Sequence, residues 1–316
     1  MTRRTGSDGT GPATTGRRTG AGGPPDGILA GVTSALRPAA LALLLLLCAC
    51  AQRGGDAGAP RAPAPGDPGR PVLLIEHVGG FVTPEMLASR LPLVGVYADG
   101  RVIAQGPVPA IYPGPALPNL QVWQLDADGV RTVVDRAVAA GVTDTGDLGS
   151  PPLADAPATR FTLVTEEGTS VREVQSLLEL PDDGGLTPEQ RAVRGELMGL
   201  IDVLGSPDAS LRAAGPVSYR PSAVAAVVAE YAAAPEPELV QPDSPWPGPA
   251  LPGEPLEERL GLSCVVARGA DADAVLDAAG RANALTPWLA ADGSRWALTL
   301  RPLLPHESGC GDLRGQ

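Results

Sequence analysis

Short apolar runs separated by turn residues predict a chain rich in strands. The clearest alternation of apolar and polar residues lies at 295–301, where Trp296, Leu298 and Leu300 should face inward and Arg301 outward. Asp-Gly and Glu-Glu-Gly sequences between such runs are typical of hairpin turns. We expect strands at 72–75, 93–97, 101–105, 120–125, 160–165, 169–175, 262–267 and 295–301.

Three stretches have helical rather than strand spacing of apolar residues. One starts at Asp126 and stops near Gly141, and a second is capped by Thr187 and ends at Gly205. A third is expected to begin with Asp271 as its N-cap. A single helical turn is also expected after Thr83, because proline follows this N-cap residue.

The segment 222–230 fits both periods, and we interpret it as a strand. The reason is a repeat: the sequence Pro-Gly-Pro-Ala-Leu-Pro follows both Tyr112 and Trp246. Each copy precedes an expected strand, helix and hairpin, so the chain could contain a tandem duplication. A duplication would make 222–230 the counterpart of the strands at 93–105.

These elements predict an α+β fold, with mostly antiparallel mixed sheet or sheets and about three packed helices. The expected organisation is a leader at 1–49, of which 1–31 is disordered or not translated, a disordered tether at 50–70, a first α+β unit at 71–232, a Pro-rich acidic loop at 233–258, and a second, smaller α+β unit at 259–316 packed on the first.

The apolar run that starts at Leu41 ends in Leu47-Cys48-Ala49-Cys50. It is too short to span a bilayer, and it resembles the lipobox of bacterial lipoproteins. The resemblance covers some ten residues and implies cleavage before Cys50, lipidation of Cys50 and an address on the outer face of the cell membrane. An ordinary secretory signal is the alternative. Because 49 residues exceed the usual length of a signal peptide, translation is expected to start near Val32.

Composition removes several kinds of chemistry. The 24 basic residues are all arginine, so a Walker A loop and a lysine Schiff base are excluded. The expected leader carries five arginines and two aspartates, so its removal changes the net charge from −12 to −15. An acidic protein is a poor candidate for binding nucleic acid, and lipid alone should hold it to the membrane.

The lipobox also assigns the cysteines. Cys48 leaves with the leader and Cys50 carries lipid, which leaves Cys264 and Cys310. Outside the cytoplasm these two are expected to form a disulfide. We expect the strands at 262–267 and 295–301 to run in opposite directions, which would bring the two cysteines to one end.

Candidate catalytic residues are few. The chain has only two histidines, so we expect no His-rich metal site, no cofactor and no catalytic motif. Glu76 and His77 are the best candidates for an ionisable pair in a cleft, whereas His306 and Glu307 are expected at the surface. Tyr112 and Trp246 are the candidate exposed aromatic residues. An Asp-x-Asp-Gly start at Asp126 lacks the terminal glutamate of a calcium loop.

The sequence therefore favours a lipid-anchored, extracytoplasmic, non-catalytic binding or interaction module, with an envelope protein or polymer as its partner. One alternative is a carboxylate-dependent hydrolase of cell-envelope polymer, which should have two carboxylates with raised pKa in a deep pocket. The other is a purely structural envelope lipoprotein.

Overall fold

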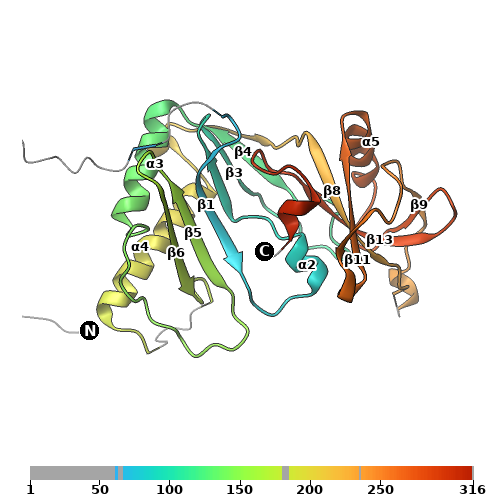
Figure 1. The fold of residues 1–316 in the computed structure, drawn as a ribbon, viewed down its shortest axis with the longest axis horizontal. Coiled ribbons are helices and arrows are strands. Elements are labelled where there is room, and N and C mark those ends of the chain that lie inside the picture. Colours follow the sequence, from blue (N-terminus) through green and yellow to red (C-terminus); the bar gives the residue numbers. More distant parts are fainter. Residues whose placement is uncertain (1–60, 63–66, 180–184, 235, 315–316) are drawn as a thin grey trace, which may run out of the picture. The chain divides into compact units, whose positions relative to one another are not determined.

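Two sheets carry the fold (Figure 1). The structure is a computed structural model that describes residues 61–62, 67–179, 185–234 and 236–314, all within one unit that spans 58–316. The lipobox and Cys50 lie outside the described residues. Both sheets are largely antiparallel and helices pack on each, so the α+β class expected from the sequence is confirmed.

The first sheet has the strand order β6-β5-β1-β2-β3-β4-β7, and every neighbouring pair is antiparallel. Its strands are β1 (Pro71–Val78), β2 (Val94–Tyr97), β3 (Arg101–Gln105), β4 (Leu120–Gln124), β5 (Ala158–Val164), β6 (Thr169–Gln175) and β7 (Ala214–Ser218). The Asp99-Gly100 turn joins β2 to β3. Gly100 is needed there because its φ is +89° and a Cβ would lie 2.2 Å from the carbonyl oxygen of Leu125.

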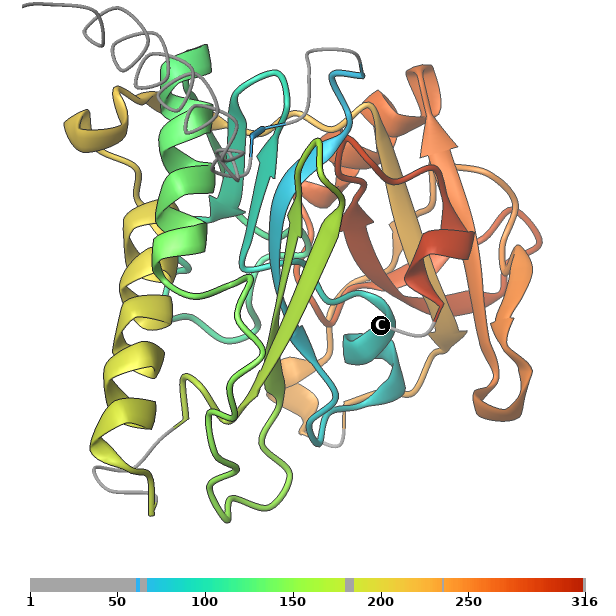
Figure 2. The ribbon, with the colours of Figure 1, turned by 60° about the vertical axis from the view of Figure 1, so that its left-hand side comes forward.

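Two helices cover one face of this sheet, as Figure 2 shows. They are α3 (Ala127–Ala139) and α4 (Pro188–Gly205). Asp126 caps α3, and Thr187 caps α4 in a reciprocal capping box with Gln190. Their apolar faces pack on alternate residues of β1 and β5 to form the first core. The short helix α2 (Pro84–Ala88) begins after Thr83, as expected, and the short 3-10 helix η1 (Ala209–Leu211) follows α4.

The second sheet has the order β10-β11-β8-β13-β12-β9, in which only the β12–β9 pair is parallel. Its strands are β8 (Ala223–Glu230), β9 (Ser244–Pro245), β10 (Glu254–Glu257), β11 (Leu262–Arg268), β12 (Pro287–Leu289) and β13 (Arg295–Pro302). The helix α5 (Ala270–Ala279) packs on one face. Three short 3-10 helices lie nearby: η2 (Pro237–Leu239), η3 (Glu258–Leu260) and η4 (Cys310–Leu313).

Residues 303–313, here called the C-terminal segment, lie between the two sheets (Figure 1). Leu304 packs with Tyr97 and Ile103 on the face of the first sheet that the helices leave free. Leu303 and Leu313 pack on the opposite side against β8 and β11. The layers are therefore α3 and α4, the first sheet, the C-terminal segment, the second sheet and α5.

Segment 222–230 is a strand, as predicted, but β8 pairs with β11 and β13 in the second sheet. It therefore does not belong with the first unit expected at 71–232. β8 is buried on both faces, which explains why its sequence shows neither alternation nor a helical stripe. Short strands β9 and β10 lie within the stretch 233–258 that was expected to be a loop.

The possible duplication does not match the topology. In the first sheet the earlier strand of the hairpin, β5, pairs inward with β1, whereas in the second sheet the later strand, β13, pairs inward with β8. Both proline-rich copies nevertheless pack on one core. Ala116 and Leu117 of the first copy and Trp246 of the second contact the core beneath α5.

Two further expectations were wrong in detail. Gly269, not Asp271, is the N-cap of α5, and no side chain caps this helix. Ordered contacts also begin within the expected tether, because the backbone N–H of Glu166 donates to the carbonyl of Arg61 (3.1 Å) and Ala62 packs on the first core.

Candidate functional site

Glu76 and His77 do not form a pair. They are neighbours on β1, so their side chains point to opposite faces of the sheet. Burial raises the pKa of Glu76 and lowers the pKa of His77. The hollow beside Glu76 has a volume of about 30 Å³, far below the roughly 300–1,000 Å³ of typical ligand pockets.

The charged cluster that the sequence missed links β13 to the C-terminal segment. Arg301, expected to face outward, is fully buried, and Glu307, expected at the surface, has a side chain only 2% exposed. Their two nitrogen–oxygen contacts measure 2.5 and 2.6 Å, which makes a bidentate ion pair. Alternation did place Arg301 on the face opposite Leu300. That face is buried because the C-terminal segment and the first sheet cover it.

Two tyrosines extend this cluster across the gap between the sheets. The Tyr97 hydroxyl lies 3.0 Å from Nδ1 of His306, and the Tyr219 hydroxyl donates to the carbonyl of Leu303 (2.8 Å). Burial raises the pKa of Tyr97 strongly, raises that of Tyr219 to about 12, and lowers that of His306. Both tyrosines therefore bond the C-terminal segment, so the cluster joins the sheets.

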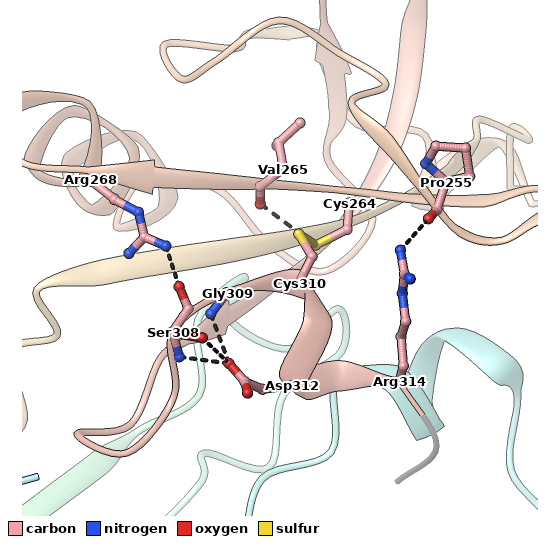
Figure 3. The surroundings of a disulfide bond; sticks show 9 residues. All are labelled: Pro255, Cys264, Val265, Arg268, Ser308, Gly309, Cys310, Asp312 and Arg314. Atoms are coloured by element: carbon pink, nitrogen blue, oxygen red, sulfur yellow. Dashed lines mark hydrogen bonds between the residues drawn. A yellow bond between two sulfur atoms is a disulfide. The ribbon is translucent and has the colours of Figure 1, made fainter.

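The disulfide between Cys264 and Cys310 is confirmed, with the two Cα atoms 6.0 Å apart (Figure 3). The strand directions used to predict it were wrong. β11 and β13 are both antiparallel to β8 and so run the same way. The C-terminal segment turns back after β13, and this reversal brings Cys310 on η4 to Cys264.

Polar contacts hold the C-terminal segment around the disulfide (Figure 3). The backbone N–H groups of Ser308 and Gly309 donate to the Asp312 carboxylate, at 2.6 and 2.8 Å. The guanidinium of Arg268 donates to the Ser308 carbonyl, and that of Arg314 to the Pro255 carbonyl (2.8 Å).

A groove of about 300 Å³ lies beside η4 and is a candidate binding site. Its walls come from α2, from β10, η3 and the start of β11, and from Leu313 and Arg314. The lining is mainly apolar, with two exposed charged residues, Glu257 and Arg314. The apolar residues include Leu87, Leu256, Leu260, Leu262 and Leu313.

No sequence pattern predicted the groove, since its three walls lie far apart along the chain. The one local signal is Leu256 and Leu260, four residues apart in a stretch otherwise rich in acidic side chains. Leu260 is 54% exposed. An apolar residue so exposed beside an apolar hollow is the feature that a partner could cover.

The two candidate aromatic residues differ. Tyr112 is exposed. Trp246 is held by its own domain, because its indole N–H donates to the Pro249 carbonyl (2.7 Å) and its ring packs edge-on against Trp288.

The chain has no significant match among protein-family models, curated proteins or solved structures. In the described part of the chain, no helix combines the length and apolar character needed to cross a bilayer. Among the same residues, no three His, Cys, Asp or Glu side chains gather as a metal site would require. The geometry of the groove is therefore the main evidence on function.

Proposed function

We propose that the protein is a lipid-anchored, extracytoplasmic binding module, and that the groove beside η4 binds an apolar side chain of an envelope protein. The observation that carries this proposal is the groove itself. It is open and mainly apolar, and Leu260 is exposed beside it. Catalysis would need converging polar groups, whereas apolar walls suit the burial of a partner's side chain.

The lipobox supports the location. Cys50 would carry the lipid, and a disulfide between the two remaining cysteines suits an oxidising compartment. Ten residues separate Cys50 from Arg61, which contacts the turn between β5 and β6. Even fully extended, such a chain spans at most about 40 Å, so the folded unit would work close to the bilayer.

The charges around the groove favour a basic partner. Glu254, Glu257 and Glu258 are exposed on β10 and η3. The whole chain has a net charge of −12, and removal of the leader, with its five arginines and two aspartates, would change this to −15. Complementary charge speeds association and selects partners. We therefore expect the bound side chain to be flanked by lysine or arginine.

The test is crosslinking in intact cells that carry the full chain, with four versions compared. Leu260→Asp puts a charge beside the groove, and Val240→Asp is the matched control, because Val240 is 52% exposed and lies outside the groove lining. Cys50→Ala removes the proposed anchor. Wild type and Val240→Asp should capture the same envelope protein, and Leu260→Asp should capture at least about tenfold less.

Cys50→Ala should also lose the crosslink, because it would leave the membrane. Equal capture by Leu260→Asp and wild type would rule out the groove as the binding surface. Equal capture by Cys50→Ala would instead rule out the anchor.

A further inference from the structure

Buried polar atoms without hydrogen-bond partners gather at one end of the first sheet. In the described residues, the complete set is His77 Nδ1, Thr159 Oγ1, Ser176 Oγ and Arg194 Nε. Native proteins leave few such atoms unbonded, and each exception calls for an explanation. If the four unbonded atoms are neighbours, one bound ligand can account for all of them.

The strand register makes three of them neighbours. His77 on β1 lies directly opposite Thr159 on β5, on the face that α3 and α4 cover. Ser176 directly follows β6, and its backbone N–H donates to the carbonyl of Pro157, two residues before Thr159. Thr159 and Ser176 are both fully buried.

Arg194 brings a positive charge to the same place from α4. Its guanidinium donates to three backbone carbonyls, at 2.7 Å to Ser176, 2.8 Å to Gln175 and 3.2 Å to Leu148. The residue is 1% exposed, and within the described chain no carboxylate forms an ion pair with it. Arg194 is thus a buried cation that three backbone carbonyls solvate and that no described carboxylate contacts.

The four free atoms suit a negatively charged acceptor. Nε of arginine can only donate, and serine and threonine hydroxyls can turn to donate. Burial lowers the pKa of His77, and a neutral imidazole can carry its proton on Nδ1. Glu179, the carboxylate whose field acts on both His77 and Arg194, is itself exposed.

We propose that His77, Thr159, Ser176 and Arg194 form an internal site for one small inorganic anion, such as chloride. The anion would accept from the four unbonded donors and balance the charge of Arg194, which a water molecule would not do. It would tie α4 to the ends of β1, β5 and β6. This site is separate from the groove beside η4.

Thermal unfolding of the whole protein tests the site, with chloride exchanged for gluconate at constant ionic strength. Gluconate is too large for an internal site of this kind. A ligand that binds only the folded state raises Tm, so chloride should raise that of the wild type by more than about 2 °C. Thr159→Val should abolish the rise, whereas Thr162→Val, on the other face of the same strand, should keep it.

A crystal of the wild type grown in bromide gives a second, direct measurement. An anomalous bromide peak within hydrogen-bond distance of Arg194 Nε is expected. A water molecule there, or a Tm that does not respond to chloride, would overturn the proposal. So would a chloride response that Thr159→Val leaves intact.

Discussion

At the scale of single residues, the ion pair between Arg301 and Glu307 places two opposite charges in the interior of the fold. Both side chains are removed from water, and Glu307 also accepts from the backbone N–H of Leu304 (2.6 Å). Nε of Arg301 donates to the carbonyl of Arg90 (3.2 Å), a residue between α2 and β2. A buried pair need not be more stable than an apolar pair, but a single remaining partner is strongly unfavourable.

Glu307→Gln should therefore lower the free energy of unfolding by about 3–5 kcal/mol, because Arg301 keeps its charge without a counterion. Urea unfolding measures this difference. Glu173→Gln is the control, since its pair with Arg160 is exposed on both sides and should matter by no more than about 1 kcal/mol. Similar effects of the two changes would contradict the buried pair.

His306 predicts a dependence on pH. Burial lowers its pKa in the folded state, and the charges of Glu307, Arg301 and Asp312 modify that shift. Below the unfolded value of about 6.5, the unfolded chain therefore binds a proton that the folded chain resists. Stability is then present above this pH and is lost as the pH falls through the folded pKa.

Thermal unfolding between pH 8 and pH 5 should show this loss, and His306→Asn should reduce it. Asparagine can keep a bond to the Tyr97 hydroxyl without titrating. Part of the loss should remain in the variant, because the pKa of His77 is lowered in the same direction. Identical pH profiles for variant and wild type would contradict a neutral, partly buried His306.

At the scale of elements, local patterns predicted most of what the structure contains. Helices α3 and α4 follow from their caps and apolar stripes, and the hairpin of β2 and β3 follows from Asp99-Gly100. Local patterns did not predict which other elements pack against a given strand or helix. Arg301 was misjudged because alternation reports which face a residue is on, and not whether another layer covers that face. β8 was predicted as a strand, but local sequence does not show which sheet a strand joins.

The C-terminal segment is the element whose role only the structure reveals. It carries Leu303, Leu304 and Glu307 between the sheets, although its sequence has no helical or strand period. Its position depends on the disulfide to Cys264, which links residues 46 apart in sequence. Loss of this link should loosen both the joint between the sheets and the groove beside it.

We expect the double change Cys264→Ala and Cys310→Ala to lower the free energy of unfolding by about 4 kcal/mol, the loop-entropy value for this separation. Denaturant unfolding gives the number, and a reducing agent should act on the wild type but not on the variant. A loss below about 1 kcal/mol would mean that packing alone holds the C-terminal segment.

At the scale of the whole molecule, the sequence did not predict how the two sheets contact each other. The walls of the groove come from α2, from Leu256 to Leu262 and from Leu313, which meet only when the C-terminal segment lies between the sheets. The proposed anion site at His77 and Arg194 likewise depends on where α4 crosses the strands. Sites built from such distant parts need the tertiary structure, whereas the lipobox resemblance and the count of cysteines need only the sequence.

The central claim is that the molecule works outside the cytoplasm, held by a lipid on Cys50. The most direct measurement is metabolic labelling with a clickable fatty acid in cells that produce the full chain, followed by membrane fractionation. Wild type and Cys48→Ala should both be labelled and remain with the membrane, whereas Cys50→Ala should lose the label. Label that persists in Cys50→Ala, or wild-type protein without label, would contradict the claim.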